Sequence, residues 1–299
     1  MLRSPAWFCV HFALVVGRLK IESWLLITVL LSAASIPLLA QQHRFTQIMG
    51  TSDQGVVTPQ EFPFSARQDA AAVNAIRAYR SAVGVSAWSD LRATGEWTLN
   101  STGSDGANEP EQATIWMRDQ REFRLDVRDA QGMSSLRMDG VIGMHQHADG
   151  RMQPMDARDA IAGLFAFPML LTATFPPAGI MLIDQGSATV DGVPLHRVTM
   201  ESPWPGNPTD AKGNPLVTVT DFYFSPQSNL LIKSAHLIRG ADPSPQQMLS
   251  VTTYGDYRQE EGMQVAHTYR ASLNGQVMWT LHLSQVRLNQ GVTRAHFHF

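Results

Sequence analysis

Residues 217–238 read VTVTDFYFSPQSNLLIKSAHLI, and this stretch decides the fold class. Two sets of side chains alternate along 217–224, as they do on the opposite faces of a β-strand. The following segment, SPQSN at 225–229, is rich in turn-forming residues, and the chain then runs back through 230–238. The stretch predicts a hairpin of two antiparallel strands.

Segments of the same kind surround this hairpin, and turn residues separate them. The pair Asn274-Gly275 is a strong turn signal, because a type I′ turn needs positive φ at both of its central positions. We therefore expect a mainly β (α+β) fold, an open, strongly curved antiparallel β-sheet or incomplete barrel wrapped over a few helices. The predicted strands are 88–100, 113–117, 122–127, 132–138, 181–185, 188–190, 193–201, 216–224, 230–238, 247–257, 264–273 and 276–288.

Two regions are expected to be helical instead. Residues 66–83 carry an apolar face at helical spacing, with Ser65 as the N-cap and Gly84 as the stop. In mid-chain, residues 156–166 and 168–173 are apolar on most sides, and a proline begins the second of these segments. We expect the mid-chain helices to cover or plug an apolar surface, and an ordinary buried helix pair is the alternative.

The N-terminal region has the layout of a secretory signal peptide. Arg18 and Lys20 precede an apolar run at 24–39, and Ala40 closes it. An uncleaved N-terminal anchor is the alternative, because the apolar run is close to the length that crosses a bilayer. The sequence thus predicts a periplasmic or secreted protein with a cleaved leader at residues 1–40.

Behind the leader we expect a flexible arm at residues 41–64 and one domain at 65–299. Cys9 is the only cysteine and lies within the leader, so the mature chain would form no disulfide and carry no lipid anchor on cysteine. Without residues 1–40 the formal net charge is −5, from 20 basic and 25 acidic residues. No basic stripe is present to neutralise phosphates, which argues against nucleic acid as a partner.

Four segments carry a family resemblance: DFYFSPQSNLLIKS at 221–234, YGDYR at 254–258, EGMQVA at 261–266 and NGQ at 274–276. With them the chain resembles the LolA-like family of periplasmic lipoprotein carriers, over about residues 65–288. The resemblance implies a curved sheet over helices with an apolar cavity for acyl chains. It transfers no functional residue, because the cavity arginine of the carriers has no counterpart that can be placed here.

The second of these segments makes a separate prediction about side-chain direction. Tyr254 and Tyr257 are three residues apart, so regular alternation places them on opposite faces of their strand with one available to the core.

Candidate ligand-binding residues are the large apolar side chains that a cavity between sheet and helices would present. A lipid tail would suit such a wall, because each buried methylene contributes about 0.8 kcal/mol. Ordinary core filling would use the same side chains. The candidate cavity wall consists of Trp97, Leu164, Phe165, Phe167 and Leu171.

No catalytic site, metal site or cofactor site is predicted, and we do not expect an enzyme. The chain has no Gly-x-Ser-x-Gly motif, no phosphate-binding glycine loop and no cysteine behind the leader. The pairs His145/His147 and His296/His298 each have the spacing of two metal ligands on one strand face, but neither has a third ligand nearby. We expect the first pair at the surface and the second at a fraying terminus.

These observations predict an exported carrier that holds a lipid, a lipoprotein acyl chain or another amphiphile. The alternative is an envelope regulatory or scaffold protein that uses the same fold to contact a protein partner, through the curved sheet or a proline-rich loop at 202–215.

Overall fold

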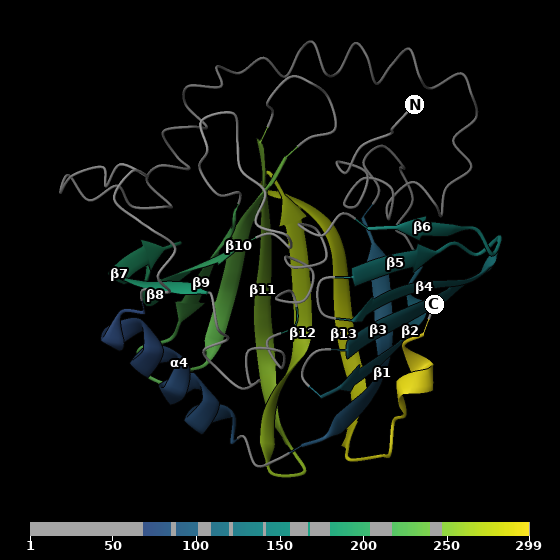
Figure 1. The fold of residues 1–299 in the computed structure, drawn as a ribbon, viewed down its shortest axis with the longest axis horizontal. Helices are drawn as coiled ribbons and strands as arrows, with labels where there is room; N and C mark the ends of the chain where they lie inside the picture. The colour runs from purple at the N-terminus through teal and green to yellow at the C-terminus, as the bar shows by residue number, and fades with distance from the viewer. Residues whose placement is uncertain are drawn as a thin grey trace.

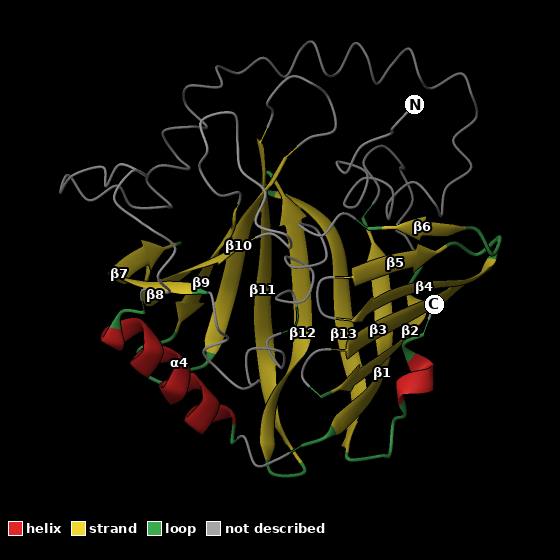
Figure 2. Cartoon of the chain, viewed as in Figure 1, coloured by secondary structure: helices red, strands yellow, loops and turns green. Residues whose placement is uncertain are grey.

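The computed structural model describes residues 68–84, 88–100, 109–119, 122–139, 142–155, 167, 180–203, 217–239 and 247–298. Nearly all of the described chain belongs to one antiparallel sheet of 13 strands, which is strongly curved and does not close (Figure 1). Strands dominate the structure, and one long helix lies at the end of the sheet formed by β7 to β9 (Figure 2). The predicted fold class is confirmed.

The sheet consists of two meanders that meet side by side. Its strand order is β6-β5-β4-β3-β2-β1-β13-β12-β11-β10-β9-β8-β7, so every contact but one joins neighbours in sequence. The exception is β1 with β13, where Leu91 lies opposite Leu288 and Thr98 lies opposite Thr280. The strands are β1 Asp90–Leu99, β2 Glu111–Arg118, β3 Glu122–Asp129, β4 Gly132–Asp139, β5 Ile142–Gln146, β6 Met152–Pro154, β7 Met181–Val190, β8 Val193–Pro203, β9 Val217–Phe224, β10 Leu231–Arg239, β11 Gln247–Glu260, β12 Met263–Leu273 and β13 Gln276–Leu288.

The predicted hairpin of residues 217–238 and the predicted turn at Asn274-Gly275 are both confirmed. β9 and β10 pair antiparallel, with Phe222 opposite Ser234. Asn274 and Gly275 both take positive φ, 49° and 84°, as a type I′ turn requires. Asp191-Gly192 does the same between β7 and β8.

The helix α4 spans Ala70–Val83 and ends at Gly84, which takes the left-handed conformation. Its start differs from the prediction, which placed the N-cap at Ser65. Gln68 instead forms a parallel bridge with Leu182, and the Asp69 N–H donates to the Leu182 carbonyl at 2.9 Å. Pairing with the edge strand β7 thus keeps these residues extended.

Within the part of the chain that the structure describes, no helix has the length and apolar character needed to span a membrane. The predicted helices at 156–166 and 168–173, the leader, the arm at 41–64 and the loop segment 204–215 lie outside the described residues.

Two expectations about strands are wrong, and a residue with positive φ explains each of them. Residues 181–190 form one strand rather than two, with a register shift between Asp184 and Gly186, whose φ is 69°. Tyr254 and Tyr257 pack against the same apolar cluster rather than on opposite faces. Asp256 between them takes a φ of 50°, which interrupts the alternation that the prediction assumed.

A bulge in β13 keeps the apolar side chains of that strand on one face. Leu281 and Leu283 are buried, and so are Val286 and Leu288, although the two pairs differ in parity. The register shifts at Ser284, where β13 has one extra residue opposite β1. This extra residue returns the side chains that follow it, including Val286 and Leu288, to the face of Leu281 and Leu283.

Gly95 is the β1 residue beside this bulge, and it leaves no room for a side chain. A Cβ at position 95 would lie 2.1 Å from the His282 carbonyl oxygen, which belongs to the backbone of the neighbouring strand. The close approach of β1 and β13 therefore depends on glycine at this position.

Replacing Gly95 with alanine should lower the free energy of unfolding by about 3 kcal/mol, the upper end of the range for overpacking, because the β1–β13 backbone would have to separate. Chemical denaturation with circular dichroism measures this. Gly255→Ala in β11 is the matched control, since a Cβ there meets no atom within 4 Å, and it should change stability little. Equal stability of the two variants would contradict the proposed role of Gly95.

Candidate functional site

One face of the sheet, which we call the inner face, carries the main apolar cluster of the protein. It is the face against which α4 packs, through Ile76, Tyr79 and Val83. Side chains alternate between the two faces along each strand, and this places the apolar residues of the cluster on one face. In β2, for example, every second residue is buried. Among its members on β1 to β3 are Leu91, Trp97, Ile115, Met117, Phe123 and Leu125.

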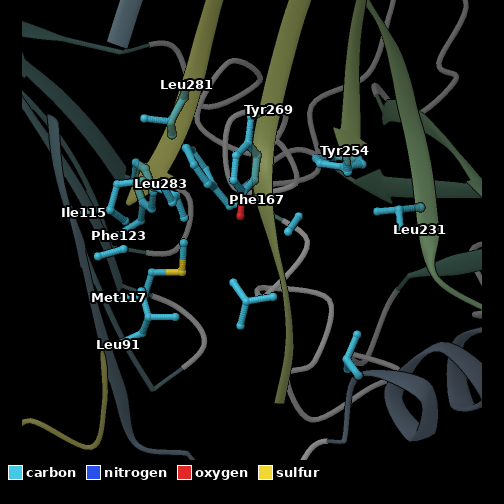
Figure 3. Close-up of a cluster of buried hydrophobic side chains, with 14 of the residues drawn as sticks. Leu91, Ile115, Met117, Phe123, Phe167, Leu231, Tyr254, Tyr269, Leu281 and Leu283 are labelled. Atoms are coloured by element: carbon cyan, nitrogen blue, oxygen red, sulfur yellow. The ribbon is translucent and has the colours of Figure 1, made fainter. Parts of the chain in front are cut away.

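An aromatic group lies at the centre of the inner face (Figure 3). The Phe167 ring lies 4.4 Å from the Phe123 ring and 5.3 Å from the Tyr269 ring, centroid to centroid. Tyr254 meets the edge of Tyr269 at 5.9 Å with an interplanar angle of 88°. Aromatic side chains from β3, β11 and β12 thereby gather around Phe167 and Tyr269, in arrangements that aromatic pairs favour.

A second aromatic contact lies on β1 and β13. Trp97 is 2% exposed and stacks on Trp279, with centroids 4.4 Å apart and an interplanar angle of 23°. Trp279 is only partly buried, so this pair extends the aromatic surface toward the outside of the cluster.

The predicted cavity-wall residues fall into two groups. Trp97 and Phe167 are both buried members of the inner-face cluster, so the structure brings these two into one surface. Leu164, Phe165 and Leu171 lie outside the described residues. A ligand-binding role for all five stays a prediction.

Sequence reasoning missed Trp279, Tyr269 and Phe123 as partners of the predicted pair. A signal for Trp279 was present, because alternation in 276–288 gives it the same parity as Leu281 and Leu283. Nothing in the sequence, by contrast, indicates that β1 pairs with β13 across nearly the whole domain.

A carboxyl group with a raised pKa lies beside this aromatic surface. Glu111 begins β2 directly opposite Trp97. Burial raises the pKa of Glu111 to about 7, and the nearby carboxylate of Asp129 adds to the shift. Near neutral pH this group is therefore divided between its acid and carboxylate forms.

The first histidine pair is buried on the inner face rather than exposed, so that expectation is wrong. His145 lies opposite Leu136 in the β4–β5 ladder and shares its face of the sheet, and its ring lies 4.2 Å from that of His147. His147 Nε2 lies 3.2 Å from Gln153 Oε1. No cluster of three possible metal ligands occurs among the residues that the structure describes.

The second histidine pair is held in place, contrary to the expectation of a fraying end. Arg124 donates to the His296 carbonyl at 3.0 Å, and Arg137 donates to the His298 carbonyl at 2.5 Å. Phe297 between them is 2% exposed. The tail thereby docks on the outer face of β2 to β4, the side opposite the aromatic group.

The outer face also carries a buried ion pair at β8 and β9. Arg197 Nη2 lies 3.2 Å from Asp221 Oδ2, and Thr199 donates to Asp221 Oδ1 at 2.5 Å. Burial raises the pKa of Asp221 and outweighs the opposing effects of the arginine and the threonine. The ion pair shares its face of the sheet with Leu195 and Tyr223, which belong to a second, smaller apolar cluster.

Stability should fall on acidification, because His145 is buried in neutral form. Burial, with smaller contributions from His147 and Arg151, lowers the pKa of His145 to about 4, from an ordinary value of 6.5. The unfolded chain therefore binds more protons between these values. The contribution of neutral His145 to the free energy of unfolding is fully present above pH 6.5. It decreases by up to about 3 kcal/mol as the pH falls, and it levels off below pH 4.

Denaturation curves between pH 7.5 and 4, for the native chain and for His145→Gln, measure this contribution. The variant should show a flatter profile by the same amount. His282→Gln removes an exposed histidine of β13 and serves as the matched control. A His145→Gln profile that parallels the native one would contradict the assignment.

Comparisons with known proteins find likeness in fold but not in sequence. No protein-family model matches the chain, and no curated protein matches it in sequence. Solved structures similar to it include a putative outer membrane lipoprotein-sorting protein domain from Vibrio parahaemolyticus, at 12% identity and a TM-score of 0.47, where the match covers 75% of this chain and 94% of that one.

Two further similar structures are a DUF1329 family protein from Desulfovibrio piger, at 10% identity, and a LolA superfamily protein from Nitrosomonas europaea, at 8%. Each has a TM-score of 0.49, and each match covers 76% of this chain and 97% of the other.

Proposed function

We propose that this chain is an exported, non-enzymatic carrier that holds the acyl chain of a lipid, a lipoprotein or another amphiphile against the inner face of its sheet. The observation that carries the proposal is the aromatic surface formed by Trp97, Trp279, Phe123, Phe167 and Tyr269 on an open sheet.

The contacts that α4 and Phe167 make with the inner face support this proposal. Among the described residues, α4 packs against β7, β8 and β12, so it covers the half of the inner face that these strands belong to. At the centre of the inner face, Phe167 contacts Phe123 of β3 and Tyr269 of β12. A hydrocarbon chain could replace such aromatic contacts at little cost, because both bury similar apolar area.

Export is part of the proposal and rests on the leader-like N-terminus. Residues 24–39 and their basic flank would direct the chain out of the cytoplasm, with cleavage near Ala40. A periplasmic or extracellular site would give the carrier access to membrane amphiphiles without a covalent anchor. An uncleaved N-terminal anchor would place the same domain at the membrane surface.

Native purification of residues 41–299 from a bacterial envelope, followed by mass spectrometry of the organic extract, tests the proposal directly. A lipid or lipid-like compound in near-stoichiometric amount is the expected result. A stable protein that carries no such compound and takes none up when challenged would exclude acyl binding and leave the regulatory or scaffold alternative, in which side chains of the protein fill the inner face.

Replacing Trp97 with alanine should weaken binding of a fluorescent fatty acid by about tenfold or more. A tenfold change in affinity corresponds to the loss of contact with about two methylenes, and the Trp97 ring would contact at least that many. Displacement titrations at fixed temperature measure the change, and near-ultraviolet circular dichroism establishes that the variant is folded.

Trp116→Ala is the matched control because Trp116 belongs to the outer face. Its ring lies under the Arg124 guanidinium, 5.0 Å from the centroid, and 6.4 Å from the ring of His296. This variant should keep native affinity for the fatty acid. A loss confined to Trp116→Ala would place the acyl chain on the outer face and contradict the proposed site.

A further inference from the structure

A band of hydroxyl side chains crosses the inner face beside the aromatic group. We call it the hydroxyl patch, and all its members are buried. It consists of Ser202 on β8, Thr218 and Thr220 on β9, Ser234 on β10, and Ser250 and Thr252 on β11.

Strand register places these side chains on the inner face and next to one another. Ser202 lies opposite Thr218, and Ser234 lies opposite Thr252. Thr220 lies one pleat from Phe222, a member of the inner-face cluster, and therefore points to the same side. The patch is continuous across four strands.

Two hydroxyls of the patch have no hydrogen-bond partner among the residues that the structure describes. Ser202 Oγ and Thr220 Oγ1 are both buried, in side chains that are 5% and 1% exposed. A buried hydroxyl without a partner is unfavourable, and native proteins rarely retain one without a ligand, water or function. Because the two residues are diagonal neighbours across β8 and β9, one polar group could reach both.

The charge of the surroundings indicates which polar group fits. His236 lies opposite Thr220, and burial lowers its pKa to about 4, so its imidazole is neutral at physiological pH. Among the described residues that strand register places on the same face of β8 to β11, none is an arginine or a lysine that could pair with a phosphate or carboxylate head group.

A hydrogen bond connects the patch to the aromatic group. Ser234 Oγ and the Tyr254 hydroxyl are 2.6 Å apart, and the Tyr254 ring contacts Tyr269. From Tyr269 on β12 to Thr220 on β9 the surface crosses three strand spacings, roughly 14 Å. An amphiphile could lie along this path with its hydrocarbon at Phe167 and its head group at Thr220.

We propose that the hydroxyl patch binds an uncharged, hydroxyl- or ester-bearing head group, so that the cargo is a neutral amphiphile of the acylglycerol class. This inference rests on the proposed function, because it assumes that the acyl chain occupies the aromatic part of the same face. Ser202 and Thr220 supply the hydrogen bonds that distinguish a neutral head group from an anionic one.

Two probes with the same oleoyl chain test the selectivity: monooleoylglycerol and oleoyl lysophosphatidic acid, in which a phosphate replaces one hydroxyl. In competition against a fluorescent fatty acid, the full mature chain should bind the neutral probe about tenfold or more tightly, because two hydrogen bonds of roughly fivefold each are at stake. Equal affinity, or preference for the phosphate, would overturn the proposal while leaving acyl binding intact.

The variant Ser202→Ala/Thr220→Val removes both hydroxyls with little change of shape, and it should lose that preference while keeping its affinity for the fluorescent fatty acid. Thr98→Val, on the opposite face of β1, is the matched control and should keep the preference. A double variant that still discriminates between the probes would overturn the assignment to these residues. Binding of neither probe by the native chain would instead exclude the proposed function itself, and this inference with it.

Discussion

The pairing of β1 with β13 is the constraint on which the rest of the structure depends. It joins residues nearly 200 positions apart and turns two separate meanders into one curved sheet. Buried Asp90 secures one end of it, since its carboxylate accepts from the backbone N–H groups of Gln290 at 2.7 Å and Gly291 at 3.2 Å. Such a long loop is entropically unfavourable to close, so this pairing is expected to form late, after both meanders.

The inner face exists only as a consequence of that pairing. Phe123 comes from one meander and Tyr269 from the other, and Phe167 from the mid-chain segment contacts both. Trp97 and Trp279 stack directly across the seam. The bulge at Ser284 matters for the same reason, because without it Val286 and Leu288 would point away from the shared surface. The acyl site proposed here is therefore a property of the joined sheet.

Local signals in the sequence were enough for most of the strands and turns, because alternation and positive-φ residue types act over a few positions. The short strands β5 and β6 were not among those predicted. They failed where distant segments intervene. Gln68 and Asp69 read as helix but pair with β7, and Tyr257 reads as outward but turns inward at Asp256. Of the candidate site, the sequence indicated Trp97 and Phe167 through their size. The stacking of Trp279 on Trp97 and the hydroxyl patch depend instead on the order of the strands, which no short pattern encodes.

The ion pair on the outer face helps explain how the hydroxyl patch keeps its direction. β9 is buried on both faces, so apolar burial alone distinguishes poorly between the two registers of this strand. A slip of one residue would carry Asp221 to the inner face, away from Arg197 and Thr199, and would leave a buried charge without its partners. Breaking a buried pair in this way is strongly unfavourable, although the pair itself adds little net stability. The Arg197–Asp221 contact thereby specifies that Thr218 and Thr220 face inward, where a head group could meet them.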